Sequence, residues 1–242
     1  MKPIICIAAI FATSLPVSAV TVLVDFGSVA GRHSVGSADS NGNFWDYITG
    51  SADDNTGLID VDGNASTINL TVTSGFTGTG TYNSGLSPVS SLGPEGDGSF
   101  AFAAVTDDAL FVNSDGSTGV LTLSGLNDSL TYDLSFYGSR VTTSDRFSTY
   151  TVGASSVELQ TSGTDIASNG TDDWNDDTVV SLTGLSPTSG QLVVNLTATS
   201  ATGGGGSNTF GYINAMSIAA VPEPSIALLG GVGLLSLLRR RR

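Results

Sequence analysis

The chain has 242 residues, of which 31 are glycine and 12 % are charged, and its formal net charge is −14. Its single cysteine, Cys6, excludes an intramolecular disulfide framework and a cysteine-based metal site. A chain this acidic is repelled by phosphate backbones, so we expect no nucleic-acid binding.

The first 19 residues have the order of a secretory signal peptide. Lys2 gives a basic start, residues 4–15 form an apolar run, and the small residues Val17, Ser18 and Ala19 follow. This order predicts export and cleavage by signal peptidase, with the mature chain starting near residue 20. Cys6 lies inside this segment, so the exported protein would contain no thiol.

The body, residues 20–219, carries most of the acidic charge. It has three basic residues, Arg32, Arg140 and Arg146, against 21 acidic ones, which gives a net charge of −18. Divalent cations and neutral polymers are therefore the partners that the charge of the body favours.

The body reads as an all-β domain. β-branched or alternating apolar segments are bounded by Gly, Asn, Asp, Ser or Pro, and no convincing helical stripe appears. We expect strands at residues 21–26, 67–73, 100–105, 119–123, 131–137, 148–152, 179–182, 191–197 and 210–218. Nine or so strands at this spacing predict a sandwich of two packed antiparallel sheets.

Two stretches of the body resemble each other. Residues 119–139 and 178–199 both contain a strand, the pattern Leu-x-Gly-Leu, a polar turn and a second, alternating strand. We interpret each stretch as a β-hairpin, repeated too few times to form a solenoid.

The order of motifs in the body resembles the galactose-binding-like jelly-roll sandwiches of bacterial surface proteins. The residues that carry the resemblance are LVDFG at 23–27, YDLSFYGSR at 132–140 and FGYINAMSI at 210–218. The resemblance implies a jelly-roll-like topology and no particular activity.

Catalytic residues are not expected. His33 lies in a Gly/Ser-rich loop, no Gly-x-Ser-x-Gly elbow is present, and the acids fall mostly in turns. We therefore predict no enzyme activity and no catalytic residue. A secreted hydrolase would need His33 or Glu158 in a cleft beside an aspartate and a serine.

Two acidic segments are candidate Ca²⁺ sites. One alternates oxygen ligands before a tight glycine turn but lacks the distal glutamate of an EF-hand, and the other places four carboxylates within six residues. The candidate ligands are Asp60, Asp62 and Asn64, and Asp172, Asp173, Asp176 and Asp177. The alternative interpretation is that both segments are solvated turns.

Sugar binding is predicted at aromatic loops. Trp45 and Tyr47 lie beside Asp46, Trp174 lies beside Asn175, and Arg140 begins a polar loop. Aromatic faces with nearby polar groups suit saccharides, and a guanidinium group can bind hydroxyls or an acidic sugar. The alternative is that both tryptophans are core residues and that Arg140 pairs with an internal carboxylate.

Residues 220–242 predict a short membrane segment. An uncharged apolar run covers residues 226–238, near the short limit for one transmembrane helix. A basic cluster follows and predicts that the C-terminus stays in the cytoplasm while the body lies outside. The cluster consists of Arg239, Arg240, Arg241 and Arg242.

The same terminal segment resembles the PEP-CTERM sorting signal of exopolysaccharide-producing Gram-negative bacteria. Pro222, Glu223 and Pro224 precede the apolar run and the arginines, and two prolines keep this stretch extended, as a protease cleft prefers. The resemblance implies that an exosortase recognises this motif and removes the tail. The precursor would be anchored in the inner membrane, and the product would reach the cell surface or extracellular matrix.

These observations predict an exported, non-catalytic module associated with carbohydrate or exopolysaccharide. Two alternatives stay open: a structural or adhesive matrix protein without a defined pocket, and a secreted hydrolase.

Overall fold

The structure, a computed structural model, describes residues 20–27, 37–39, 41–50, 54–55, 57–81, 108–113, 117–164, 166, 173–175, 178–199 and 210–222. One compact unit spans Ala19–Val221. The predicted signal peptide, the apolar run at 226–238 and the terminal arginines lie outside the described residues. Within the described ranges, no helix is long and apolar enough to cross a membrane.

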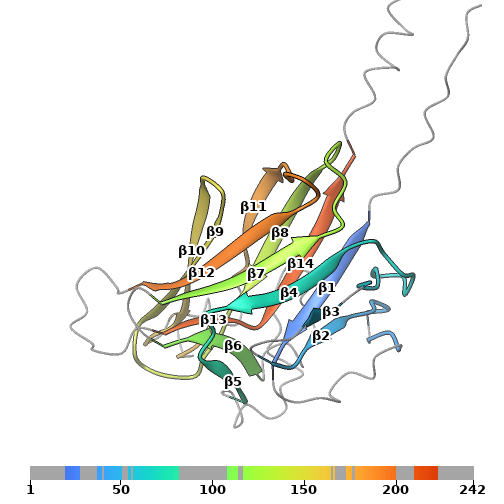
Figure 1. Cartoon of the computed structure of the whole chain (residues 1–242). Coiled ribbons are helices and arrows are strands. Elements are labelled where there is room, and N and C mark those ends of the chain that lie inside the picture. The colour runs from blue at the N-terminus through green and yellow to red at the C-terminus, as the bar shows by residue number, and fades with distance from the viewer. Residues whose placement is uncertain are drawn as a thin grey trace, which may run out of the picture. The chain divides into compact units, whose positions relative to one another are not determined.

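Two main sheets form a sandwich, which confirms the predicted all-β, two-sheet architecture (Figure 1). The five-stranded sheet has the order β11-β8-β14-β1-β2, and the six-stranded sheet has the order β10-β9-β12-β7-β4-β3. The strands of the first are β1 Thr21–Phe26, β2 Asp46–Ile48, β8 Thr131–Tyr137, β11 Val180–Leu185 and β14 Ala215–Val221. Those of the second are β3 Asp54–Asn55, β4 Asn69–Ser74, β7 Thr118–Ser124, β9 Arg146–Val152, β10 Ser155–Ser162 and β12 Leu192–Thr199.

Two features of the sheets depart from the expectation. A third, three-stranded sheet has the order β13-β6-β5, with β5 Gly78–Thr81, β6 Asp108–Val112 and β13 Gly211–Ile213. In addition, β2 pairs with β1 in parallel, whereas the other described strand pairs are antiparallel.

The core lies between the two main sheets and follows the two-residue period of the strands. On β8, every second residue from Tyr132 to Phe136 is buried, and on β12 the same holds from Leu192 to Ala198. The rings of Phe136 and Tyr150, one from each sheet, stack with their centroids 4.4 Å apart. This pair joins the two sheets at the centre of the core.

A smaller apolar cluster packs beside the main one. It contains Leu23, Trp45, Tyr137 and Ala215, with Val61 and Val179 packed against it. Leu23 alternates with Val22 and Val24, which belong to the main cluster, so the small cluster lies on the other face of β1. This second layer explains why both faces of β1 and β14 are buried.

The two similar stretches are not hairpins, contrary to the prediction. In the first, β7 belongs to the six-stranded sheet and β8 to the five-stranded sheet, and in the second β11 and β12 are divided in the same way. Each stretch is therefore an arch that crosses between the sheets. The first strand of each copy pairs with the second strand of the other, β7 with β12 and β11 with β8.

The loops of the two arches also bond to each other. Leu126 N donates to the Gly190 carbonyl at 3.1 Å, and Gly190 N donates to Asp128 Oδ1 at 2.7 Å. Gly190 has a φ of 71°, a conformation that favours glycine. The leucines of the Leu-x-Gly-Leu pattern, at the end of the first strand of each arch, belong to the main core cluster. The chain therefore crosses the sandwich at these points instead of turning back along the same sheet.

Most predicted strands are present, with small shifts at their ends. The segment predicted at 210–218 is divided by Asn214 into β13 and β14, which belong to different sheets. The strand predicted at 100–105 lies outside the described residues. The strands β2, β3, β5, β6 and β10 were not expected, and of these β10 forms a clear hairpin with β9 across Gly153.

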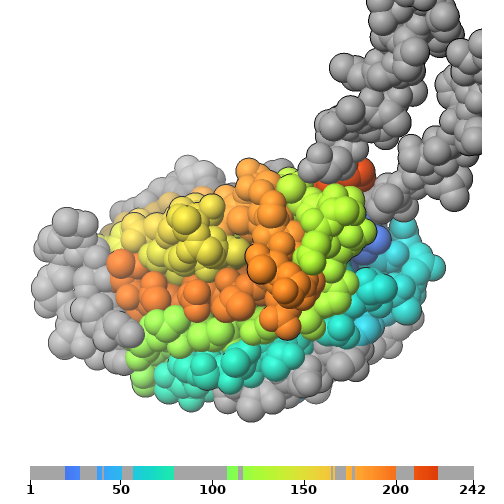
Figure 2. All heavy atoms as spheres, turned by 45° about the horizontal axis from the view of Figure 1, so that its top comes forward, coloured from blue at the N-terminus to red at the C-terminus, as the bar shows by residue number. Residues whose placement is uncertain are grey.

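The outer face of the six-stranded sheet is rich in hydroxyl groups. Figure 2 shows β10, β12, β7 and β4 crossing this face as successive yellow, orange, green and teal bands. The hydroxyls of Thr73 and Thr122 lie 2.8 Å apart, and those of Thr149 and Thr199 lie 2.6 Å apart. These side-chain pairs tie neighbouring strands together.

Candidate functional site

Trp45 lies inside the small apolar cluster. Its side chain is 3 % exposed, and its indole Nε1–H donates to Asp39 Oδ2 at 2.8 Å. The ring packs with Leu23, Tyr137 and Ala215. Tyr47, two residues later in β2, is half-buried. The ring of Trp45 is thus placed as a packing element with its polar atom satisfied.

Asp39 and Asp60 build two loops of the same design. Asp39 Oδ1 accepts the backbone N–H groups of residues 41 and 43, and Asp60 Oδ1 accepts those of residues 62 and 64. A glycine with positive φ follows at the fourth position of each loop, Gly42 at 87° and Gly63 at 83°. Each aspartate therefore closes its own turn, as Asx motifs do.

The two sets of predicted calcium ligands differ in their surroundings. Asp60 also receives the side-chain amide of Asn64, at 3.3 and 3.2 Å, and Asp62 is exposed. In the second segment, Asp173 is described, whereas Asp172, Asp176 and Asp177 lie outside the described residues. Across the described ranges, no group of three or more His, Cys, Asp or Glu side chains is placed to hold a metal ion.

Trp174 lies on a short segment that joins two other loops. It forms an isolated bridge with Ser162, and Asn175 N donates to the Thr161 carbonyl, which also accepts Arg140 N. Trp174 is half-buried, and within the described ranges its indole N–H has no hydrogen-bond partner. Trp174 and Arg140, which the sequence offered separately as ligand residues, thus lie on segments that both contact Thr161.

Asn175 holds this segment in place. Its side-chain amide donates to the carbonyls of Gly138 and Thr178, at 3.0 and 2.8 Å, and the buried Tyr137 hydroxyl donates to its carbonyl at 2.7 Å. Burial of 98 % of Asn175 makes these bonds strong constraints on the loop.

A group of aromatic side chains surrounds Arg146 at the start of β9. Phe111 in β6 stands opposite Tyr212 in β13, and Phe210 lies on the same side of the chain as Tyr212, two residues earlier. The three ring centroids are 6.1, 6.3 and 6.2 Å apart. We call Phe111, Arg146, Phe210 and Tyr212 the aromatic–arginine cluster.

The guanidinium group of Arg146 lies over two of these rings. Its Cζ is 4.4 Å from the Phe210 centroid and 5.7 Å from the Tyr212 centroid, within the range of cation–π attraction. Arg146 Nη1 donates to the Tyr212 hydroxyl. The Nε–H of Arg146 is buried and has no hydrogen-bond acceptor among the described residues.

Tyr212 is held rigidly by three hydrogen bonds to its backbone. Its N–H donates to Ser148 Oγ at 2.7 Å, and its carbonyl accepts the Ser148 hydroxyl at 3.0 Å and the Tyr150 hydroxyl at 2.6 Å. Burial raises the pKa of Tyr212, and the charges of Arg146 and Arg140 offset part of that rise. The Tyr212 phenol is therefore neutral at physiological pH and does not neutralise Arg146.

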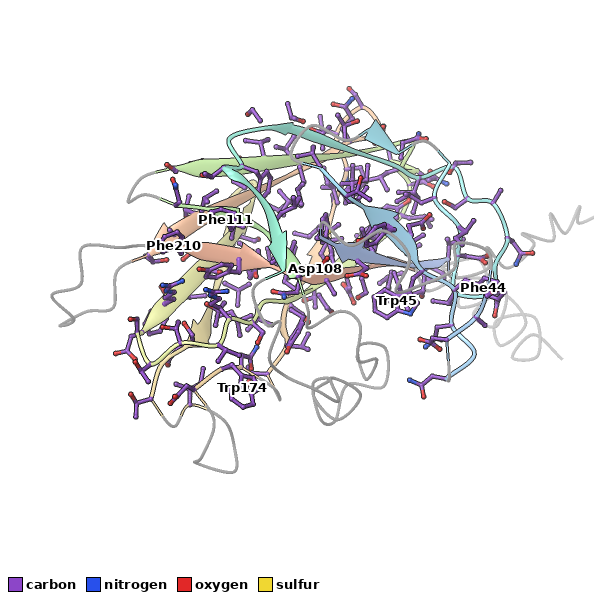
Figure 3. The ribbon with its side chains drawn as sticks, turned by 90° about the horizontal axis from the view of Figure 1, so that it is seen from below. Phe44, Trp45, Asp108, Phe111, Trp174 and Phe210 are labelled. Carbon is purple, nitrogen blue, oxygen red and sulfur yellow. The ribbon has the colours of Figure 1, made fainter. Side chains whose placement is uncertain are left out.

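The cluster is separate from Trp45 and Trp174. Figure 3 shows Phe111 and Phe210 next to each other, with Trp45 and Phe44 in another group and Trp174 on a third segment. Phe111, Arg146 and Phe210 are half-buried, so part of each side chain faces the solvent. The alternation of Phe210 and Tyr212 was visible in the sequence, but the approach of Phe111 and Arg146 from other strands was not.

A shallow hollow of about 580 Å³ lies at the tip of the β9–β10 hairpin. Serine, threonine, asparagine and glutamine side chains share its wall with Leu185, Leu192 and Val193, and no charged or aromatic residue lines it. Such a wall offers hydrogen bonds without a stacking platform for a sugar ring.

The residues considered for hydrolysis do not form a cleft among the described residues. Glu158 is exposed on β10, where it pairs with Thr149, and His33 lies outside the described residues. Burial raises the pKa of the Asp46 carboxyl from 3.8 to about 7, although the hydrogen bond from the Ile59 N–H lowers it in part.

Comparisons with known proteins give partial overlaps. The sequence matches no protein-family model, and no curated protein sequence matches it. Among solved structures, the ANX2 ectodomain from Arabidopsis thaliana shares 10 % identity and a TM-score of 0.43, covering 70 % of this chain and 54 % of its own. This chain therefore spans about half the length of that ectodomain.

Two further structures contain bound galactose units. An exo-β-1,3-galactanase from Phanerochaete chrysosporium with galactose has 18 % identity and a TM-score of 0.27, covering 46 % of this chain and 23 % of its own. TmCBM61 in complex with β-1,4-galactotriose has 13 % identity and a TM-score of 0.23, covering 48 % and 72 %. These scores are low, and the fold class rests on the strand pairing of the chain itself.

Proposed function

We propose that the chain is an exported, non-catalytic module of the cell surface or extracellular matrix, and that it associates with extracellular polysaccharide. The aromatic–arginine cluster carries this proposal. Half-exposed rings offer faces to the apolar side of a sugar, and a guanidinium group fixed beside them offers hydrogen bonds to its oxygens.

The proposal assigns the binding surface to the cluster and not to Trp45. The Trp45 ring is 3 % exposed and its indole N–H is already bonded, so a sugar would have to displace Asp39 and the small apolar cluster. Phe210 and Phe111 need no such rearrangement. Arg140 and Trp174 belong to neighbouring loops and would contact a longer glycan, whereas Tyr47 lies in β2 beside Asp46.

Affinity electrophoresis of the full-length chain in mild detergent tests the proposal, with gels that contain a neutral or a carboxylated polysaccharide. We expect at least one polymer to retard the chain and Phe210→Ala to weaken that retardation. Phe147→Ala is the matched control, since Phe147 is a half-buried phenylalanine of β9 outside the ring group. Equal effects of both substitutions, or no retardation by any polymer, would leave the alternative of a structural matrix protein.

The sorting of the protein is a second part of the proposal. We infer that Pro222, Glu223 and Pro224 form a PEP-CTERM motif read by an exosortase in a Gram-negative bacterium, after signal peptidase has removed residues 1–19. Pro222 directly follows β14, and Glu223 and Pro224 lie outside the described residues. Alanine at all three positions should leave an uncleaved precursor in the inner membrane; normal release of that variant would contradict the inference.

Calcium is proposed as a ligand of the acidic segment at residues 172–177 and not of Asp60. The carboxylate of Asp60 is already engaged by the N–H groups of its own turn. A hard divalent ion would neutralise the repulsion between the four clustered aspartates.

A further inference from the structure

Arg146 is a half-buried cation for which the described residues offer no carboxylate partner. One of its five N–H bonds donates to the Tyr212 hydroxyl, and its Nε–H has no acceptor. Charged groups taken out of water are normally paired, because desolvation otherwise disfavours the charged form. The two aromatic rings offset only part of this cost.

The charge of the protein makes this arrangement unusual. The body carries 21 acidic residues against three basic ones, and the charges of Arg146 and Arg140 both offset the rise that burial causes in the pKa of Tyr212. Arg146 is also bonded to the Tyr212 hydroxyl. An anion beside Arg146 would supply a counter-charge and an acceptor for its Nε–H.

We propose that the aromatic–arginine cluster binds a carboxylate-bearing sugar residue, with Arg146 holding the carboxylate and Phe210 facing the sugar ring. This inference rests on the proposed polysaccharide binding and names the class of sugar at the same site. A planar guanidinium group matches the two oxygens of a carboxylate, and the adjoining ring matches the apolar face of a pyranose.

The charge of the body also restricts the polymer around that sugar. With its net charge of −18, the body repels a polymer that carries a negative charge on every residue. It repels a doubly charged phosphate group more strongly than a singly charged carboxylate. The favoured ligand is therefore a mostly neutral polysaccharide with isolated carboxylates. Salt should strengthen binding to a densely charged polyuronate by screening this repulsion.

Affinity electrophoresis can test the inference with glucuronoxylan, which carries sparse glucuronate groups, and with the same polymer after reduction of its carboxyl groups. We expect the full-length chain to bind the native polymer about tenfold more tightly than the reduced one, the usual effect of one charge-assisted hydrogen bond. Arg146→Gln should remove this preference, so that the native and the reduced polymer bind the variant equally, and more weakly than the native polymer binds the unmodified chain. Arg146→Lys keeps the positive charge but loses the planar guanidinium group that can bind both carboxylate oxygens. This variant should therefore show part of the preference that Arg146→Gln loses.

The outcomes separate this inference from the proposed function. Equal binding to native and reduced polymer would overturn the role of the carboxylate but leave polysaccharide association intact. Binding to neither would contradict both. Stronger binding to dextran sulfate than to glucuronoxylan would indicate a site for anions in general and not for carboxylates, and would also overturn the inference. If Arg146→Gln lowers the melting temperature, free glucuronate competing with glucuronoxylan for the unmodified chain provides the second measurement, and failure to compete would again overturn it.

Discussion

Asp46 shows how position decides the chemistry of a single carboxyl group. It is 7 % exposed, and both of its oxygens accept the Ile59 N–H, at 3.2 and 3.0 Å. Removal from water penalises the charged form more than this one hydrogen bond supports it, which raises the pKa of Asp46 to about 7. Because Trp45 and Tyr47 flank Asp46, the sequence predicted a sugar-binding loop here. Nothing in the sequence indicated that the Asp46 carboxyl group is buried.

The raised pKa of Asp46 predicts a pH-dependent loss of stability. Between about pH 4 and pH 7 the folded chain keeps the Asp46 proton while the unfolded chain has lost it, so unfolding becomes easier as the pH rises. We expect Asp46→Asn to be more stable than the unmodified chain at pH 8, by about 1–2 kcal/mol after allowance for partial solvent screening, and to lose this advantage near pH 4.

Urea unfolding of the full-length chain at several pH values measures this difference. Asp62→Asn is the control, because Asp62 is an exposed carboxyl group that should leave the slope of stability against pH unchanged. A constant difference between Asp46→Asn and the unmodified chain across the pH range would contradict the prediction.

The residues of the proposed binding site were harder to predict than the buried ones. Leu, Val and Ile at alternate positions pointed to the core, since the two-residue period of a strand is local information. The aromatic–arginine cluster depends on three separate strands that meet, β6, β9 and β13, and no spacing within one segment records that meeting. Trp45 was predicted as a ligand residue because composition does not distinguish a half-exposed indole from one that is 3 % exposed.

At the level of elements, the paired arches organise the sandwich. Each carries the chain from one sheet to the other, and their strands pair crosswise, so the two copies depend on each other. The sequence repeat was therefore a real feature whose geometry was misread: a hairpin and an arch have the same alternation, and only the long-range partner distinguishes them. The strands themselves were largely predictable, because their apolar alternation and Gly-rich boundaries are local.

Asn214 is the residue at which the chain passes from the three-stranded sheet into the five-stranded sheet. Its side chain accepts Ser139 N–H at 2.8 Å and donates to the Asp108 carbonyl at 2.7 Å, while its backbone bonds to Phe26 and Tyr137. Asn214→Ala would leave two backbone groups unpaired in a site where Asn214 is 1 % exposed. We expect a loss of about 2–4 kcal/mol of stability.

Chemical unfolding of the full-length chain tests this expectation, with Asn127→Ala as the matched control. Asn127 also accepts hydrogen bonds through its side chain, from Ser129, but it is exposed in an arch loop. Its replacement should change stability by less than about 1 kcal/mol. Similar losses in both variants would argue against a special role for the junction at Asn214.

For the whole molecule, charge is the dominant property. A body with three basic and 21 acidic residues repels itself. The outer face of the six-stranded sheet, which crosses Figure 2 as bands from yellow to teal, is rich in hydroxyl groups. The proposed preference for weakly charged polymers is consistent with the strongly negative charge of the body.

Salt should therefore stabilise the folded chain. Between about 0.01 M and about 1 M NaCl the screening length falls from about 30 Å to about 3 Å, which weakens repulsion among the carboxylates. We expect the melting temperature of the full-length chain to rise by a few degrees over this range. A fall would show that attractive ion pairs outweigh the repulsion.

The same measurement with CaCl₂ and MgCl₂ at equal ionic strength addresses the proposed calcium site. Screening alone gives the same rise with both salts. An additional rise with Ca²⁺, abolished by Asn at positions 172, 173, 176 and 177, is the result expected of a site in that segment. Equal curves would remove calcium from the proposed ligands.

The placement of β14 has a mechanical consequence. This last strand lies between β8 and β1, with seven paired positions on one side and five on the other. A tension applied through the chain after Val221 runs along the strand axis, at right angles to its hydrogen bonds, so both rows must shear together before the strand can slide. A tension between the two ends of the body would peel β1 from β14 pair by pair, because Thr21 and Ala219 are partners at the same edge. Force applied through the chain after Val221 and opposed elsewhere in the domain is thus resisted better than force applied between residues 20 and 221.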